Sequence, residues 1–273
     1  MSPRSLTNNR AVSLLTRLHR NLVEEGGFDI CHLFHPAWYN QMITRESLSV
    51  RPLSASGRSV GLLVGNTKRL WPRFCEWYAE PQRRNHHQDV ARSENPFDTF
   101  VEEQISMITK QTITDTNPIH FYWSHDTDPD RLVAMSRLAS CAGLTYLDQN
   151  SYLSIHPEYG AWHSFRAAIV IEDIDIDHTG LALDPDNPPP PQPRLLTQDE
   201  EAAATHAMQH ALNVSKASNN PPSSQDDIDR IQEQTEAWIA VRDVISRGKK
   251  EYRFDHDQLY YHYTKDSSKY LKS

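Results

Sequence analysis

Two arginines stand in apolar parts of the sequence. Arg166 lies near the start of the apolar run SFRAAIVI, and Arg242 interrupts the apolar helix face between Trp238 and Ile245. A buried guanidinium is costly unless a hydrogen-bonding or anionic group answers it. One explanation is a salt bridge within the protein. The nearby carboxylates are, for Arg166, Glu172 and Asp173, and, for Arg242, Asp243 and Glu236. The other explanation, favoured by a tyrosine-rich final segment, is a site for an anionic organic ligand.

Other patterns that could bind a metal or carry out catalysis match known motifs less well. His206 and His210 are four residues apart, but no glutamate follows the first histidine as in the HExxH zinc motif. His32 and His35 are interpreted as ordinary surface or core histidines. The acidic run IEDIDIDH (171–178) lacks the glycine and distal glutamate of an EF-hand loop. No dinucleotide-binding, P-loop or nucleophile-elbow motif occurs. The sequence therefore predicts no metal bound by protein side chains.

The composition is that of a globular protein with an acidic balance. The 273 residues carry a net charge of −8 and are 38% hydrophobic, which allows a sizeable core. Nucleic acid is excluded as the main partner, because phosphate binding requires a basic face. Cys31, Cys75 and Cys141 are widely spaced, which predicts free thiols in a reducing compartment. No apolar run is long enough for a membrane span, so the predicted location is the cytoplasm.

The elements that must position the two arginines alternate between helices and strands. Four-residue spacing of Leu14, Leu18 and Leu22 predicts an opening amphipathic helix rather than a mitochondrial transit peptide. Helices are also predicted from Thr67, from Asn95, over 128–143, from TQDE (197–200), over 228–245 and over about 255–271. Strands are predicted at 59–66, 119–125, 144–149, 151–156 and 164–172, and residues 28–41 are expected to be extended. The later strands follow one another and favour antiparallel pairing, so the predicted fold class is α+β.

The composition changes after the last of these strands. The polyproline segment LDPDNPPPPQPR (183–194) is expected to be extended and poor at packing. The stretch NVSKASNNPPSSQDD (213–227) has the composition of a disordered surface insertion. Residues 1–273 are interpreted as a single domain, with a flexible segment at about 183–227 and C-terminal helices at about 228–271.

A resemblance to a known family is carried by the string IHPEYGAWHSFRAAIVI (155–171). It resembles the Ile-His-Pro, Gly, Trp and Arg signature of the intracellular cobalamin-processing CblC family, the methylmalonic aciduria and homocystinuria type C family. Four further segments resemble that family in the same order. They are GGFDICHLFHPAWYNQ (26–41), LASCAGLTYLDQ (138–149), WIAVRDV (238–244) and EYRFDHDQLYYHYT (251–264).

The resemblance implies a fold similar to the flavin-dependent nitroreductases, a sheet with flanking helices. It also implies that cobalamin binds in the base-off form and loses its upper axial ligand. Alkyl groups would leave by glutathione-dependent dealkylation, a transferase reaction. Cyanide would leave in a cyanocobalamin reductase step, with electrons from reduced FAD or FMN or from a thiol. The family further implies a type D cobalamin adaptor protein as a partner.

The matched positions imply two groups of site residues. Arg166 and Arg242 would favour the glutathione thiolate and hold its carboxylates, with Lys269 as a weaker substitute for a third arginine. The expected cobalamin contacts are Gln149 and Ser151 for the propionamides or the tail, with Tyr146, Ile155 and Phe165 as pocket walls. His156 is assigned either to cobalamin or, with Trp162, to the scaffold of the turn made by Pro157 and Gly160.

Three departures from the family pattern favour the thiol-dependent route over flavin-driven decyanation. Only Asn150 separates Gln149 from Ser151, where many relatives have a long loop, and Ser140 and Tyr152 replace a histidine and a glycine. Two other functions stay open. They are a flavin-dependent nitro or quinone reductase and a non-catalytic cobalamin carrier.

Overall fold

The chain forms two compact units in the computed structural model, which describes residues 3–46, 52–54, 58–80, 95–113, 117–174, 181, 183–216 and 225–265. Unit 1 comprises Met1–Thr145 and Ser164–Gln192, and unit 2 comprises Tyr146–His163 and Pro193–Ser273. The single-domain interpretation stays a prediction, because two compact units can belong to one domain.

Unit 1 is built on a four-stranded antiparallel sheet. Its strands are β1 (Ile30–Phe34), β2 (Val60–Asn66), β3 (Ile119–Trp123) and β6 (Ser164–Ile171), in the order β1-β2-β6-β3. Every pair in this sheet is antiparallel. All residues of β2 are buried, because the two central strands are covered on both faces.

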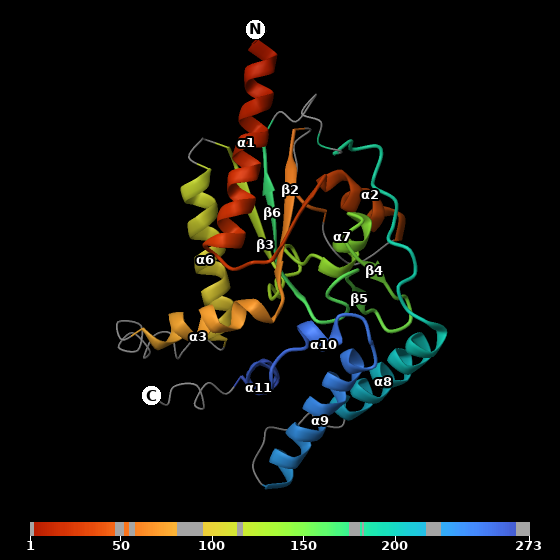
Figure 1. Cartoon of the computed structure of the whole chain (residues 1–273). Helices are drawn as coiled ribbons and strands as arrows, with labels where there is room; N and C mark the ends of the chain where they lie inside the picture. Colours follow the sequence, from red (N-terminus) through yellow and green to blue (C-terminus); the bar gives the residue numbers. More distant parts are fainter. Residues whose placement is uncertain are drawn as a thin grey trace. The chain divides into compact units, whose positions relative to one another are not determined.

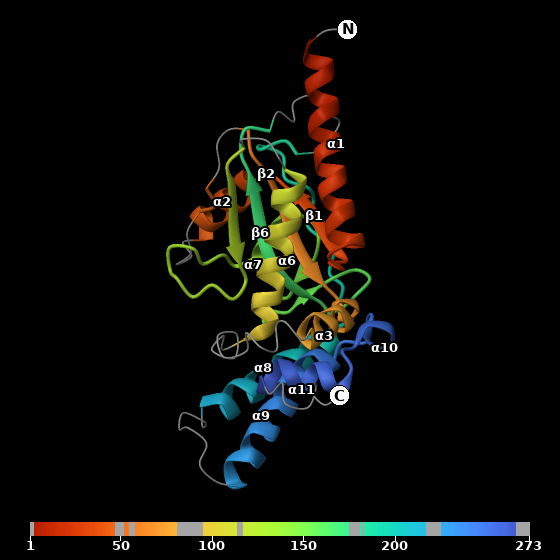
Figure 2. The same ribbon diagram turned by 90° about the vertical axis from the view of Figure 1, so that its left-hand side faces the viewer.

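Two pairs of helices cover the sheet. Helices α1 (Pro3–Glu24) and α6 (Pro96–Thr112) lie on one face, and α2 (Pro36–Glu46) and α7 (Met135–Cys141) lie on the other (Figures 1 and 2). A 3-10 turn, η1 (Lys68–Leu70), leads into α3 (Trp71–Ala79), and Thr67 occupies the predicted N-cap. The face of α6 predicted to be apolar is buried, at Phe97, Val101, Ile105 and Ile108.

Two predictions for unit 1 are wrong in part. Residues 28–41 were expected to be extended, but the chain turns into α2 at Pro36, which suits the first helical position. The helix expected from Asp128 begins only at Met135, and Leu132 is 39% exposed. The carboxylate of Asp128 accepts a hydrogen bond from the backbone N–H of Asp130, so a side-chain turn replaces the first helical turns.

Unit 2 combines a short hairpin with four helices in the part that is described. The hairpin pairs β4 (Tyr146–Leu147) with β5 (Ser154–Ile155), so each predicted strand keeps only two paired residues. The helices are α8 (Gln198–Lys216), α9 (Gln225–Asp243), α10 (Lys249–Tyr252) and α11 (His256–Thr264). Helices α8 and α9 lie side by side (Figures 1 and 2), and Trp238 Nε1 donates a 3.0 Å hydrogen bond to Ser215 Oγ.

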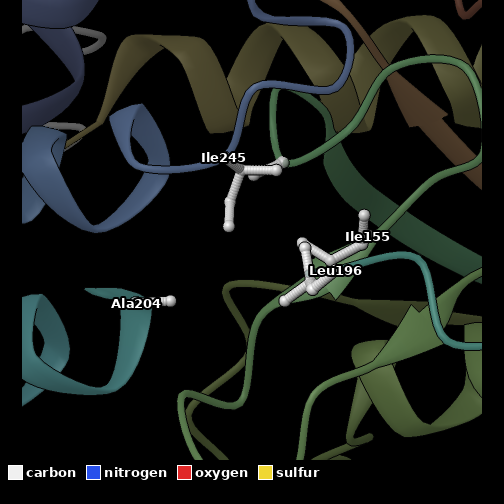
Figure 3. Packing of buried hydrophobic residues seen from close by; sticks show 5 residues of the cluster. Ile155, Leu196, Ala204 and Ile245 are labelled. Carbon is white, nitrogen blue, oxygen red and sulfur yellow. The ribbon is translucent and has the colours of Figure 1, made fainter. Parts of the chain in front are cut away.

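A small apolar core joins the hairpin to the helices of unit 2. Figure 3 shows how Ile155 of β5, Leu196, Ala204 of α8 and Ile245 approach one another. Together with Ala161, these residues are at most 5% exposed. The core holds the segment after β5 and the end of α9 in one arrangement, which positions the aromatic cluster described below.

The C-terminal third also corrects three predictions. Residues 213–216 are helical in α8 and 225–227 are helical in α9, so the insertion predicted at 213–227 is wrong at both ends. Residues 217–224 lie outside the described part. Helix α9 ends at Asp243, before the predicted 245. Helix α11 ends at Thr264, because Lys265 adopts a left-handed conformation with φ 58°. Residues 266–271 of the predicted helix lie outside the described part.

The predicted capping box at the start of α8 is confirmed. Thr197 Oγ1 accepts from the Glu200 backbone N–H at 3.1 Å, and the Glu200 carboxylate accepts from the Thr197 backbone N–H at 3.0 Å. The same carboxylate accepts from the backbone N–H of Ser246 at 2.9 Å, which fixes the segment after α9. Burial alone would raise the pKa of Glu200, but the hydrogen bonds from Ser246 and Thr197 outweigh burial and lower it.

Thr197→Ala is expected to lower the free energy of unfolding by about 1 kcal/mol, because it leaves the Glu200 N–H without its cap. Urea unfolding followed by far-UV circular dichroism measures the loss. Thr205→Ala is the matched control, since its hydroxyl bonds only the Glu201 carbonyl within α8, and it should stay within about 0.5 kcal/mol of wild type. Equal losses in the two variants would contradict the capping role.

Candidate functional site

Arg166 lies in unit 1, on the central strand β6. Its Nε donates a 2.7 Å hydrogen bond to Oδ1 of Asn66, which is fully buried at the end of β2. The guanidinium also lies over the ring of Phe97, with 4.6 Å between Cζ and the ring centroid. The neighbouring Phe165 is buried, with 9% of its surface exposed. An arginine is tolerated in this strand because the Asn66 amide oxygen and the Phe97 ring stabilise its charge.

Arg242 lies in unit 2, near the end of α9, in a different setting. Its guanidinium carbon is 5.8 Å from the ring centroid of Trp162 and 5.7 Å from that of Phe254. Trp162 is fully buried and Phe254 is 2% exposed, so both rings are fixed by packing. Among the described residues, no carboxylate pairs with this guanidinium. An arginine held on aromatic faces without an internal counter-ion is suited to receive an anion.

The carboxylates considered for these arginines have other partners. Glu236 accepts a 2.9 Å hydrogen bond from Gln232, and Glu172 lies 3.0 Å from His120 Nε2. The salt bridge proposed between Arg242 and Asp243 or Glu236 is therefore wrong.

Asp243 is engaged by two other cations. Arg253 Nε and Nη2 donate to its two oxygens at 2.8 and 2.9 Å, and Lys249 Nζ lies 3.4 Å from Oδ1. Burial alone would raise the pKa of Asp243, but Arg253 and Lys249 outweigh burial and lower it. Arg253 also lies over the Trp162 ring at 5.3 Å. Two guanidinium groups thus share one indole, and the one from Arg253 is neutralised by Asp243.

The buried groups around this cluster add no competing charge at neutral pH. Burial, with smaller contributions from His156 and Arg242, lowers the pKa of His163 to about 3. Burial raises the pKa of Tyr263, and the nearby Arg242 opposes that shift. Trp162 Nε1 is a buried donor that has no hydrogen-bond partner within the described residues. Within the described part of the chain, the cluster therefore presents the Arg242 guanidinium without a carboxylate partner, beside neutral aromatic groups.

The hairpin residues expected to contact cobalamin differ in how available they are. Gln149 is exposed, and its Nε2 makes only a 3.4 Å hydrogen bond to the Leu147 carbonyl. Tyr146 donates its hydroxyl to Glu201 at 3.0 Å. Ser151 is fully buried, and its hydroxyl and backbone N–H both donate to Asp148. A ligand could reach the Ser151 hydroxyl only if this turn opened.

Ile155 and His156 serve the scaffold of unit 2. Ile155 belongs to the apolar core of Figure 3 and is fully buried. His156 Nδ1 accepts from the backbone N–H of Tyr159 at 3.2 Å, and the two rings stack 4.2 Å apart. Gly160 pairs with His156 in an isolated β-bridge and has φ +59°. This geometry is the turn scaffold expected for Pro157, Gly160 and His156, while a ligand role for His156 stays a prediction.

Sequence reasoning missed two members of these clusters. Asn66, which holds Arg166, ends a buried strand, and Arg253, which neutralises Asp243, sits in the quoted segment EYRFDH. Lys269 lies outside the described residues. Cys31, Cys75 and Cys141 form no disulfide bond. Within the described ranges, no group of three His, Cys, Asp or Glu side chains could hold a metal ion, and no helix is long and apolar enough to cross a membrane.

Comparison with known proteins gives a match in structure. No family model matches the sequence, and no curated protein matches it. Among solved structures, the chain is similar to the crystal structure of CblC from C. elegans, a B12-trafficking protein described as a homologue of human MMACHC. The TM-score is 0.55 at 16% sequence identity, and the match covers 87% of this chain and 97% of that chain. The chain therefore has a CblC-like fold, which confirms the resemblance at the level of the fold.

Proposed function

We propose that this protein binds cobalamin base-off and removes its upper axial ligand. The observation that carries the proposal is the guanidinium of Arg242, which no carboxylate of the described residues pairs and which is held over Trp162 and Phe254 while Arg253 occupies Asp243. A cation prepared in this way suits the carboxylates and the thiolate of glutathione. The CblC-like fold supports cobalamin as the second substrate, since the C. elegans protein of that fold is a B12-trafficking protein.

The proposed dealkylation is a displacement at carbon. The glutathione thiolate attacks the alkyl carbon bound to cobalt, a carbon–sulfur bond forms, and the cobalt–carbon bond breaks with both electrons remaining on cobalt. Arg242 favours this step by lowering the pKa of the bound thiol, and it holds a glutathione carboxylate. The same role, implied for Arg166 by its matched position, stays a prediction. Lys269 is assigned a weaker contact of the same kind. The cobalamin carries the reactive metal, while the protein binds and orients the two reactants.

The remaining assignments concern the corrin and the second reaction. Gln149 is the proposed partner of a propionamide, because its exposed amide is available for hydrogen bonding. Tyr146 is proposed as a wall of the corrin pocket, with Ser151 and His156 as further contacts. The pocket-wall roles implied for Ile155 and Phe165 stay predictions. Reduced FAD or FMN would supply electrons for decyanation on a nitroreductase-like sheet, and a type D adaptor in the cytoplasm would receive the product.

The test is a visible-absorbance titration of methylcobalamin with purified protein, followed by anaerobic glutathione. Binding should shift the spectrum from the base-on to the base-off form. Glutathione should then convert methylcobalamin to reduced cobalamin with formation of the methyl thioether. A titration without protein is the control for the uncatalysed reaction.

The other outcomes separate the competing functions. A base-off shift without a glutathione response would contradict catalysis and indicate a carrier. No shift at micromolar protein would overturn the whole proposal. A purified protein that is yellow with bound flavin would then favour a nitro or quinone reductase.

A further inference from the structure

The polyproline segment of unit 1 has a regular pattern of exposure. Residues 187–192 belong to no helix or strand. Pro188, Pro190 and Pro191 are exposed, while Pro189 and Gln192 are half-buried. The half-buried positions are three residues apart, which is the period of a polyproline II helix. The pattern predicts that one edge of such a helix faces the protein and that its other two edges face solvent.

Contacts within unit 1 hold this segment at both ends. Before the prolines, Trp38 Nε1 of α2 donates a 2.7 Å hydrogen bond to the Asp184 carbonyl, and Gln41 Nε2 donates to the Pro185 carbonyl at 3.3 Å. After them, Gln192 Nε2 donates a 2.6 Å hydrogen bond to the Gly143 carbonyl. The exposed prolines are therefore displayed on anchored backbone.

Gly143 explains how the inner edge approaches the protein. A Cβ at this position would lie 3.0 Å from Pro189 Cγ and 3.3 Å from the Pro190 carbonyl oxygen. The glycine therefore lets Pro189 pack close to the end of α7. The chain buries the edge that carries Pro189 and Gln192, and it leaves Pro188, Pro190 and Pro191 uncovered.

We propose that Pro188, Pro190 and Pro191, named here the proline ridge, form a docking ligand for a domain that reads polyproline II segments. Such domains bind proline rings in grooves lined by aromatic side chains, and SH3, WW and EVH1 domains are of this class. The ridge offers the Pro-x-x-Pro spacing through Pro188 and Pro191. Because the backbone is anchored, binding loses less conformational entropy than with a free peptide.

Negative charge beside the proline ridge indicates which kind of binding groove fits this surface. Asp184 and Asp186 are exposed just before the prolines. The hydrogen bond from Asn187, assisted by the Asp186 backbone N–H, lowers the pKa of Asp184, so this carboxylate is ionised at neutral pH. A groove with a basic residue beside its aromatic side chains therefore fits this surface best, and its binding should weaken as salt increases. None of these residues belongs to the proposed cobalamin chemistry.

The experiment immobilises the full chain and measures binding of purified SH3, WW and EVH1 domains by biolayer interferometry. At least one domain should bind, and Pro188→Ala/Pro191→Ala should weaken that binding by about tenfold or more. Pro189→Ala is the matched control on the inner edge, and its binding should stay within about twofold of wild type.

Two results would overturn the proposal. One is that no domain of the three classes binds the wild-type chain at millimolar concentration. The other is that the outer-edge and inner-edge variants weaken binding equally. That result would show that binding depends on the stiffness of the chain rather than on the exposed proline rings. Circular dichroism of each variant checks that the fold is retained.

Discussion

Gly160→Ala is expected to lower the free energy of unfolding of unit 2 by about 2–5 kcal/mol, the sum of a left-handed backbone penalty and an overpacking penalty. Gly160 has φ +59°, a conformation that L side chains rarely adopt. A Cβ there would lie 1.8 Å from the carbonyl oxygen of Arg247, so backbone must move. Urea unfolding measures the loss, and hydrogen exchange should locate it in residues 154–163 and 244–254.

The matched control for this variant is Gly143→Ala. Gly143 also has a positive φ, +71°, but the nearest atom to its added Cβ would be a proline ring carbon at 3.0 Å. The expected loss is mainly the backbone penalty, about 1–2 kcal/mol, because the proline ring would have to move by only a few tenths of an ångström. If the two alanine variants lost equal stability, the close approach of Gly160 to Arg247 would not be the cause.

Arg242→Gln should slow glutathione-dependent demethylation of methylcobalamin by about 100-fold, because two charge-assisted hydrogen bonds, each worth about tenfold, are lost. Cobalamin affinity should change little, since the substitution removes the proposed glutathione receptor and not a corrin contact. Arg242→Lys keeps the positive charge but lacks the bidentate guanidinium group, so its demethylation rate should lie between those of wild type and Arg242→Gln. Single-turnover decay of the methylcobalamin spectrum, measured against glutathione concentration, gives the rate and the apparent affinity separately.

Arg20→Gln is the control for this experiment, because Arg20 is an exposed arginine on α1. The demethylation rate of this variant should equal that of wild type. The Arg242 variant should lose only about 1 kcal/mol of stability, because it gives up its contacts with the Trp162 and Phe254 rings while no described carboxylate depends on this guanidinium. A base-off complex with an unchanged demethylation rate would remove Arg242 from the chemistry. Failure to bind cobalamin in every variant and in wild type would instead contradict the proposed function as a whole.

Local features of this chain could be predicted from sequence because their causes lie within a few residues. The continuous apolar run of β2 indicates a strand buried on both faces, and the Asn95-Pro96 pair indicates the start of α6. The Thr197 capping box is likewise a reciprocal pair of hydrogen bonds between residues three apart. Where two local signals competed, as at Asp128, the prediction failed because the turn was misread as a helix start.

The candidate site could be predicted only in part. The sequence identified Arg166 and Arg242 as guanidinium groups that required partners. It did not identify those partners, because Asn66 is 100 residues from Arg166 along the chain. Ser151 was expected to face a ligand, yet its hydroxyl closes a buried turn on Asp148, and such a choice depends on packing rather than residue type.

The sequence by itself determined the α+β class, most elements and the two arginines that stand in apolar surroundings. Only the tertiary structure decided that Arg242 meets no carboxylate among the residues that are described. Asp243 is adjacent to Arg242 in sequence, but its carboxylate faces Arg253 and Lys249. Adjacent residues on a helix point in directions about 100° apart, so neighbours in sequence need not meet, and a residue ten positions away can. The charge available to a ligand is therefore a property of the fold.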